Sequence, residues 1–167
     1  MPKIVENLRE RILEVARRQI IENGYSKVTM RSIAKDCKIG LGTIYNYFES
    51  KDFIVATYMA EDWKICLDKI QNNIINNKPT LESIYYGLLE FISDHNKLFT
   101  DVNAEISYAT NAMKWHPIFR QQIAVLILQL CHNDEFLSEF IAESLISWSI
   151  EKKEYSLLSP ILETLLK

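Results

Sequence analysis

The sequence predicts an all-α protein, and two observations support that fold class. Among 167 residues there are only four glycines and four prolines, so few positions interrupt a helix. Apolar residues recur at steps of three and four along most of the chain, which is the spacing of one helix face. The composition, with 48% hydrophobic and 25% charged residues, is that of a globular protein with a buried core.

An N-terminal group of short helices is predicted to precede a longer helix. Asn23-Gly24 ends the first helix, because glycine tolerates the left-handed conformation that closes a helix. Thr29 and Ser50 are good N-caps for the helices that follow them. The helices predicted in this part of the chain are 5–23, 30–37, 41–48 and 51–73.

A second group of helices is predicted beyond the asparagine-rich residues 72–79, which form the clearest break in the chain. These helices are 80–95, 101–115, 117–132 and 135–153. A final short helix is expected to begin after Ser156 or Ser159, with Pro160 in its first turn, where a missing N–H does no harm. The predicted domains are residues 1–51 and 52–167.

Charge is distributed unevenly along the chain. Residues 1–51 hold 10 Lys and Arg against 6 Asp and Glu, whereas residues 52–167 hold 9 against 16. A basic head on an acidic body favours contact between the head and a polyanion, although ordinary solvated surfaces also fit an excess of this size. No secretory leader or bilayer-long apolar run is present, so we expect a soluble cytoplasmic protein without a membrane partner.

The three cysteines do not indicate a metal site. Cys37, Cys66 and Cys131 are far apart, and no histidine lies at metal-ligand spacing from them. Each stands in an apolar helical pattern. We therefore expect buried, reduced thiols and neither a metal nor another cofactor.

Residues 29–51 have the layout of a helix-turn-helix, two short helices joined by a tight turn. Ala34 is small where the two helices must cross closely. The small core between them is expected to comprise Ile33, Cys37, Ile39, Ile44 and Phe48. The outer face of the second helix then carries Gly42, Thr43, Asn46 and Tyr47, where they could reach the major groove of DNA.

This stretch resembles the TetR family of bacterial repressors, over most of residues 8–53. The elements in the family's order and spacing are Asn23-Gly24-Tyr25, Thr29, Ile33-Ala34, Gly42-Thr43-Ile44-Tyr45, Tyr47-Phe48 and Ser50-Lys51. The resemblance implies a three-helix DNA-binding domain, joined by a linker helix to a C-terminal helical domain for ligand binding and dimerisation. Beyond residue 52 no family signature is found.

The resemblance also implies roles for single residues. Thr43 and Asn46 would face base edges, whereas Tyr45, Tyr47 and Lys51 would contact phosphates. Beside a phosphate, Lys51 and the free N–H groups of its helix N-terminus form an anion site. Alternatively, Tyr45 is a core aromatic and Asn46 a solvated polar residue. The DNA-binding residues predicted are Thr29, Gly42, Thr43, Tyr45, Asn46, Tyr47 and Lys51.

Two positions depart from the family pattern. Lys38 occupies the turn position that is usually glycine, and we expect its φ to be positive at a cost of about 1–2 kcal/mol. Gly40 stands where a Ser or Thr often opens the second helix, so the cap is weaker and lacks a hydroxyl for a phosphate. Both affect the expected DNA affinity more than the fold.

The C-terminal helices are apolar on more than one face. In residues 135–153 one stripe is Phe136, Phe140, Ser144 and Trp148, and the next is Leu137, Ile141 and Leu145. The final segment has the stripes Leu157, Ile161, Leu165 and Leu158, Leu162, Leu166. We expect these helices to form the four-helix interface of a homodimer. The alternative is that both helices lie in the monomer core.

Aromatic residues between the linker helix and these stripes suggest a cavity for a flat, hydrophobic ligand. The candidate ligand-binding residues are Trp63, Tyr85, Tyr86, Phe91, Glu105, Tyr108 and Trp115. Helical aromatic stripes are more often plain core, and that alternative stays open. The sequence does not identify the ligand.

Together these features predict a sequence-specific transcriptional regulator that binds a near-palindromic, double-stranded DNA operator as a homodimer. We expect a repressor that a small hydrophobic or aromatic effector releases from the operator. An activator and a ligand-independent regulator are alternatives with the same fold. A helical adaptor and an enzyme are less favoured, because no nucleophile–base spacing, phosphate loop or metal cluster is found.

Overall fold

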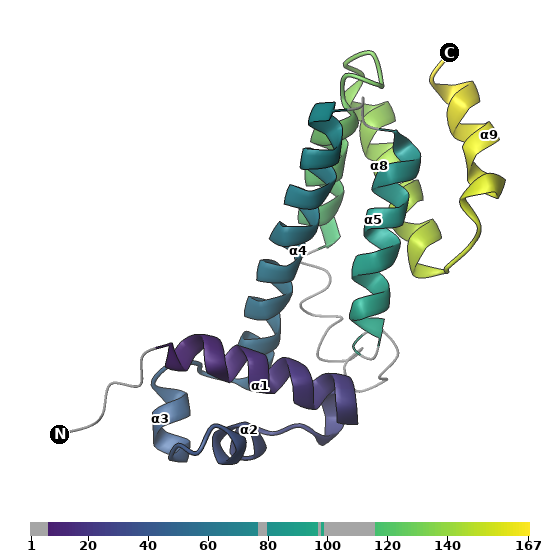
Figure 1. Cartoon of the computed structure of the whole chain (residues 1–167). Helices are drawn as coiled ribbons and strands as arrows, with labels where there is room; N and C mark the ends of the chain where they lie inside the picture. The colour runs from purple at the N-terminus through teal and green to yellow at the C-terminus, as the bar shows by residue number, and fades with distance from the viewer. Residues whose placement is uncertain (1–6, 77–79, 97, 99–115) are drawn as a thin grey trace. The chain divides into compact units, whose positions relative to one another are not determined.

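The computed structural model describes residues 7–76, 80–96, 98 and 116–167, and every regular element within these ranges is a helix (Figure 1). This confirms the all-α prediction; the predicted helix 101–115 lies outside the described residues. The labelled elements are α1 (Leu8–Asn23), the 3₁₀ turn η1 (Tyr25–Lys27), α2 (Met30–Asp36), α3 (Leu41–Tyr45), α4 (Lys51–Asn76), α5 (Leu81–Asp94), α8 (Glu135–Ile150) and α9 (Tyr155–Leu165). Residues 116–127 are also helical.

The chain divides into two compact units. The first combines Met1–Asp62 with His95–Ser107, and the second combines Trp63–Asp94 with Tyr108–Lys167. Helix α4 is continuous across the boundary between Asp62 and Trp63. Each unit buries an apolar core of its own.

In the first unit, α1 lies against α2 and α2 lies against α3. Helices of seven and five residues are unstable in isolation, so α2 and α3 depend on this packing. The side chains that are 1% exposed or less in this unit include Ile12, Ala16, Ile20, Ile33, Ile44 and Phe48. Burying a large apolar side chain contributes roughly 1.5–3 kcal/mol, so the burial of these residues helps to hold the short helices.

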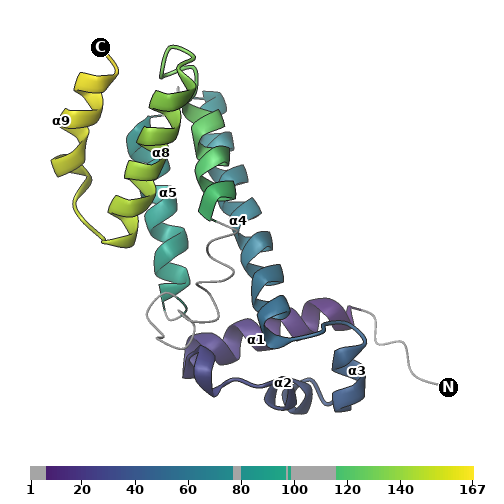
Figure 2. The same ribbon diagram turned by 180° about the vertical axis from the view of Figure 1, so that it is seen from behind.

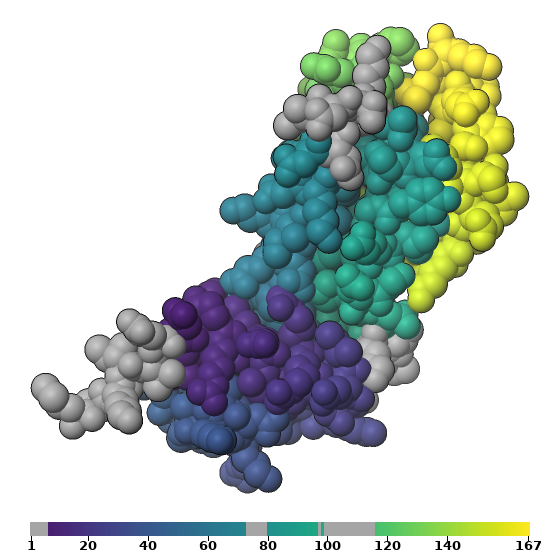
Figure 3. Space-filling model, viewed as in Figure 1, coloured from purple at the N-terminus to yellow at the C-terminus, as the bar shows by residue number. Residues whose placement is uncertain are grey.

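In the second unit, α5 packs against α8, and α9 contacts both (Figure 2). Helix α9 forms an outer edge of this unit (Figure 3). Its inner side buries Leu158 and Leu162, whereas Leu157, Ile161 and Leu165 are exposed. One of the two predicted stripes of the final helix therefore belongs to the chain's own core, and the other faces solvent.

Several helix ends follow the predicted local signals. Thr29 accepts a hydrogen bond from the backbone N–H of Ser32, and Ser50 accepts one from that of Phe53 at 3.1 Å. Gly24 closes α1 with a φ of 84°. The caps at Thr29, Ser50 and Gly24 are thus confirmed.

Two helices end earlier than predicted. The helix expected at 117–132 covers residues 116–127, and α8 ends at Ile150 instead of reaching residue 153. In both cases a residue with positive φ follows, His132 at 55° and Lys152 at 53°. A left-handed residue reverses the chain, so the apolar pattern extends further than the helix does.

The final helix begins before the predicted serines. It starts at Tyr155, so the expectation that Pro160 lies in its first turn is wrong, and the proline sits inside the helix. The Tyr155 ring packs 5.4 Å from that of Tyr85, whose hydroxyl donates to the carbonyl of Lys153. This tertiary contact holds the chain at Tyr155, before the serines at which the helix was expected to begin. The helix tolerates a proline that cannot donate to the carbonyl four residues earlier.

The three cysteines are free and buried, as expected. Burial raises the pKa of the Cys66 thiol to about 11, so the reactive thiolate is scarce at neutral pH. Burial also raises the pKa values of Cys37 and Cys131. Within the described ranges, no helix has the length and apolar content required to span a bilayer.

Candidate nucleic-acid interface

A tight turn joins α2 to α3, as the helix-turn-helix layout requires. Lys38 has a φ of 54°, which confirms the left-handed conformation predicted there. The N–H of Ile39 donates to the carbonyl of Ala34 at 3.0 Å, which closes the end of α2. Gly40 is extended, and its carbonyl accepts from the N–H of Thr43 to start α3.

The core predicted between the two helices is present with one exception. Ile33, Ala34, Cys37, Ile44 and Phe48 are all buried. Ile39, also predicted to belong to this core, is only half-buried. It lies in the turn and not on a helix face, so only part of its side chain meets the packed surface.

The second helix is shorter than predicted, because α3 ends at Tyr45 and not at Phe48. Asn46 and Tyr47 follow it in a turn and remain exposed, as does Gly42, while Thr43 is half-buried. Tyr45 is 51% exposed and Tyr47 44%, so Tyr45 is not a core aromatic. The predicted groove-facing residues therefore lie together at the surface around α3.

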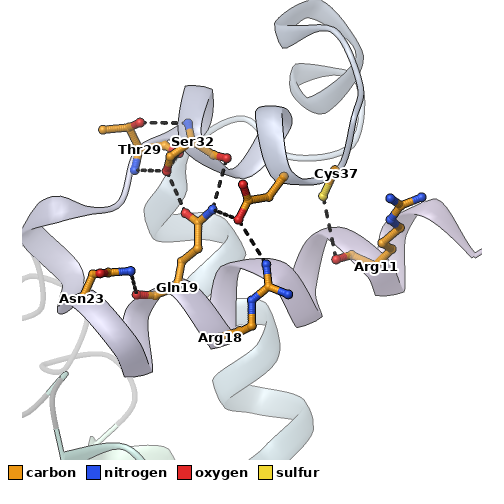
Figure 4. Close-up of polar contacts among 8 residues, drawn as sticks. Arg11, Arg18, Gln19, Asn23, Thr29, Ser32 and Cys37 are labelled. Atoms are coloured by element: carbon orange, nitrogen blue, oxygen red, sulfur yellow. Dashed lines mark hydrogen bonds and ion pairs between the residues drawn. The ribbon is translucent and has the colours of Figure 1, made fainter.

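A buried amide fixes α1 against α2. Gln19 is 6% exposed, and its Nε2 donates to the carbonyl of Ser32 at 3.1 Å and to Asp36 Oδ2 at 2.8 Å (Figure 4). Its Oε1 accepts from the Ser32 hydroxyl at 2.7 Å. Arg18 adds an ion pair to Asp36 at 3.1 Å. The hydrogen bond from Gln19 is the first cause of a lowered pKa at Asp36, which is therefore ionised at neutral pH.

The hydrogen bonds of Gln19 to Ser32 and Asp36 were not predicted from the sequence. Gln19 falls on the apolar face of the first helix, between Ala16 and Ile20, where a lone polar residue is the signal that was available. Buried amides need partners, so the position itself indicates a hydrogen-bonded contact. The partners lie 13 and 17 residues away and could not be named from the pattern.

The start of α4 is tied to η1. The Nζ of Lys51 donates to the carbonyl of Tyr25 at 2.9 Å and lies 3.6 Å from the centroid of that ring. The Tyr25 hydroxyl donates to Asp52. Lys51 therefore has a structural role in addition to the phosphate contact predicted for it. Thr29 is exposed and caps α2 through its hydroxyl.

The predicted ligand-binding residues are only partly described. Trp63 and Phe91 are buried and pack edge to face at 5.2 Å, and the Trp63 indole donates to Gln122 at 2.6 Å. Tyr85 is buried, whereas Tyr86 is 50% exposed. The candidates outside the described residues are Glu105, Tyr108 and Trp115.

Comparisons with known proteins bear on this arrangement. Residues 12–57 match the family model for bacterial regulatory proteins of the tetR family. An HTH-type transcriptional regulator of Staphylococcus aureus (strain MRSA252) is 26% identical over 139 residues, which are 81% of this chain and 73% of that protein.

Two solved structures are similar in fold. A TetR-family transcriptional regulator from Haemophilus influenzae RD aligns with a TM-score of 0.59 and 16% identity, covering 98% of this chain and 97% of that one. Thermus thermophilus FadR, a TetR-family repressor in complex with lauroyl-CoA, aligns with a TM-score of 0.61 and 16% identity, covering 95% and 92%.

The family match covers the helix-turn-helix, and the relatives are regulators of transcription and not enzymes. Both fold neighbours share the all-helical architecture along nearly the whole chain. The resemblance carried by residues 8–53 is therefore confirmed. Residues 12–57 of this chain thus form a helix-turn-helix of the TetR type, and the chain is similar to bacterial transcriptional regulators of that family.

Proposed function

We propose that this regulator is a homodimeric repressor whose α3 binds the major groove of a near-palindromic operator. The exposed polar and aromatic side chains around α3, on a helix held by a sealed core, are the observation that supports it. In this proposal residues 1–51 bind DNA, and residues 52–167 bind the effector and dimerise. Binding to a duplex that weakens steeply with salt is the first test.

The residues around α3 divide by chemistry. Thr43 and Asn46 carry short hydrogen-bonding groups suited to base edges, and Tyr45 and Tyr47 carry hydroxyls that reach phosphates. A Cβ added at Gly42 would meet nothing within 4 Å, so packing inside the protein does not require glycine there. Close approach of DNA is a reason for glycine at this position.

Thr43 and Lys51 should affect DNA binding differently. Lys51→Ala should weaken binding to all duplexes similarly and lower the slope of log affinity against log salt by about 1. Thr43→Ala should instead change the preference among bases at one position by about 1–3 kcal/mol. Duplexes selected from a random pool by the wild-type protein provide the probe. If both variants lose the same sequence preference, the groove-facing side is misassigned.

The salt slope is the decisive readout for Lys51, because its contact with Tyr25 also contributes to folding. A variant that is merely less stable would bind less while keeping the wild-type slope. An unchanged slope in Lys51→Ala would remove the phosphate contact from the proposal.

Replacement of Lys38 separates backbone strain from charge. Lys38→Gly should raise the free energy of unfolding by up to about 1 kcal/mol, because glycine relieves the left-handed backbone but gains freedom when unfolded. Lys38→Ala keeps the Cβ and should bring no such gain. Urea unfolding measures both variants, and equal stabilities would contradict the strain argument. If Lys38 contacts a phosphate, both variants bind DNA more weakly at low salt.

The dimer is proposed to form through the exposed stripes of α8 and α9. The exposed side chains of this surface are Phe136, Phe140, Leu157, Ile161 and Leu165, and the half-buried Trp148 belongs to the same stripe of α8. Phe136 is 81% exposed, Leu157 64% and Ile161 57%. A surface this apolar on neighbouring helices favours association with its own copy across a two-fold axis.

A charge in this surface should separate the protomers. Ile161→Glu should give monomers in analytical ultracentrifugation and lose most operator binding, because two half-sites are no longer held together. Leu162→Ala is the matched control, since Leu162 is buried within the chain and its truncation lowers stability without altering the exposed stripe. A dimeric Ile161→Glu protein would place the interface elsewhere.

The effector is proposed to be a hydrophobic molecule such as a long-chain acyl thioester. The support is the likeness in fold to FadR bound to lauroyl-CoA, together with the aromatic side chains of the second unit. Lauroyl-CoA at micromolar concentration should release the protein from its selected duplex, whereas coenzyme A alone should not. If neither releases it while DNA binding is intact, the effector belongs to another chemical class.

A further inference from the structure

The carboxylate of Asp62 joins three segments that are distant in the sequence. Its Oδ1 accepts from Arg17 of α1 at 2.5 Å, and its Oδ2 lies 2.9 Å from Nε2 of His95, the residue that follows α5. The side chains are 20%, 35% and 8% exposed for Asp62, Arg17 and His95. We call these three residues the Asp62 clamp, and all of them belong to the first unit.

Tyr58 supports the clamp from the preceding turn of α4. The Arg17 guanidinium lies 5.3 Å from the centroid of the Tyr58 ring, and the His95 ring stacks on it at 6.2 Å with an interplanar angle of 19°. Tyr58 is 1% exposed, so it provides a fixed surface. Both partners of Asp62 are thereby held in one orientation.

Arg17 depends on this clamp for its position. Its Nε is buried and has no hydrogen-bond partner within the part of the chain that the structure describes. The guanidinium is therefore held by Asp62 and by the Tyr58 ring. A partly buried cation that loses its carboxylate partner must move toward solvent.

The clamp lies within the first unit and includes two residues at which the chain leaves or re-enters that unit. Asp62 is the last residue of the first unit along α4, and His95 is the first residue after α5 to belong to that unit again. The contact between Asp62 and His95 thus joins the point where the chain leaves the first unit to the point where it re-enters that unit. A shift at the end of α5 acts on His95 directly through the backbone.

Helix α1 can pass such a shift on to the helix-turn-helix. Arg17 and Gln19 are two residues apart, about 200° around the helix, so they lie on opposite sides of α1. Arg17 engages the clamp, while Gln19 holds α2 through Ser32 and Asp36. Helix α1 is therefore held between α4 on one side and α2 on the other.

We propose that Asp62 is a positioning residue that couples the end of α5 to the DNA-binding helices through Arg17 and α1. While the clamp is closed, α1 and α2 hold α3 ready for the operator. Displacement of His95 opens the clamp and lowers operator affinity. This rests on the proposed function of α3, so wild-type binding to its selected duplex is measured first, and its absence would count against that function alone.

Asp62→Asn removes the charge with little change in shape and should lower affinity for that duplex roughly 5- to 30-fold, a typical size for coupling between sites. His95→Phe keeps a ring against Tyr58 but deletes the hydrogen bond, and should produce a similar loss. The double variant should be no weaker than Asp62→Asn, because both changes interrupt one chain of contacts. Additive losses would overturn the coupling.

Glu61→Gln is the matched control. Glu61 pairs with Arg9 at 3.1 Å, also between α4 and α1, but contacts nothing after α5 in its described interactions. Loss of one negative charge should by itself strengthen binding to DNA slightly, since it removes a repulsive charge. Glu61→Gln should therefore bind as well as wild type or better, and an equal loss in both variants would overturn a specific role for Asp62.

Hydrogen exchange distinguishes coupling from general destabilisation. In Asp62→Asn the amides of α1 around Arg17 should exchange faster, while those of α8 keep their wild-type protection. Faster exchange throughout both helices would mean that Asp62 serves only stability, and this would overturn the proposal. Unchanged exchange in α1 would overturn it as well.

Discussion

The buried amide of Gln19 is the contact on which the orientation of the DNA-binding helices depends. Apolar packing between α1 and α2 is strong but not directional. The three hydrogen bonds of Gln19 to Ser32 and Asp36 are directional and favour one register of the two helices. Leaving such a group unpaired in a buried position costs about 1–3 kcal/mol, so alternative registers are disfavoured. Specific placement of α3 follows from specific placement of α2.

Local signals were predictable from the sequence because their causes are local. The cap at Thr29, the stop at Gly24 and the left-handed turn at Lys38 each depend on neighbouring backbone and one side chain. The exposed face around α3 also followed from spacing, together with the family resemblance. These features include the turn and the exposed face of the candidate DNA-binding site.

Features that depend on distant partners could not be predicted. The Asp62 clamp unites residues 33 and 45 positions apart, and nothing near Asp62 in the sequence indicates either partner. Pro160 was misplaced because the Tyr155 ring finds Tyr85 across the second unit and starts the helix early. The two stripes of the final helix look alike in sequence, yet Leu162 packs inward and Ile161 outward. Which of the two stripes packs inward depends on where α5 and α8 lie against the final helix.

The two exposed surfaces differ in chemistry, and the difference matches the partners proposed for them. Around α3 the exposed side chains carry hydroxyl and amide groups, which satisfy the polar edges and phosphates of a nucleic acid. The exposed stripe of α8 and α9 offers almost only carbon, which gains from burial against an equally apolar surface and cannot satisfy a polar one. Nucleic acid placed against the apolar stripe, or a second copy of that stripe placed against α3, would leave the polar groups of the other surface unpaired. The segregation of the two chemistries therefore supports the proposed partner of each surface by exclusion as well as by attraction.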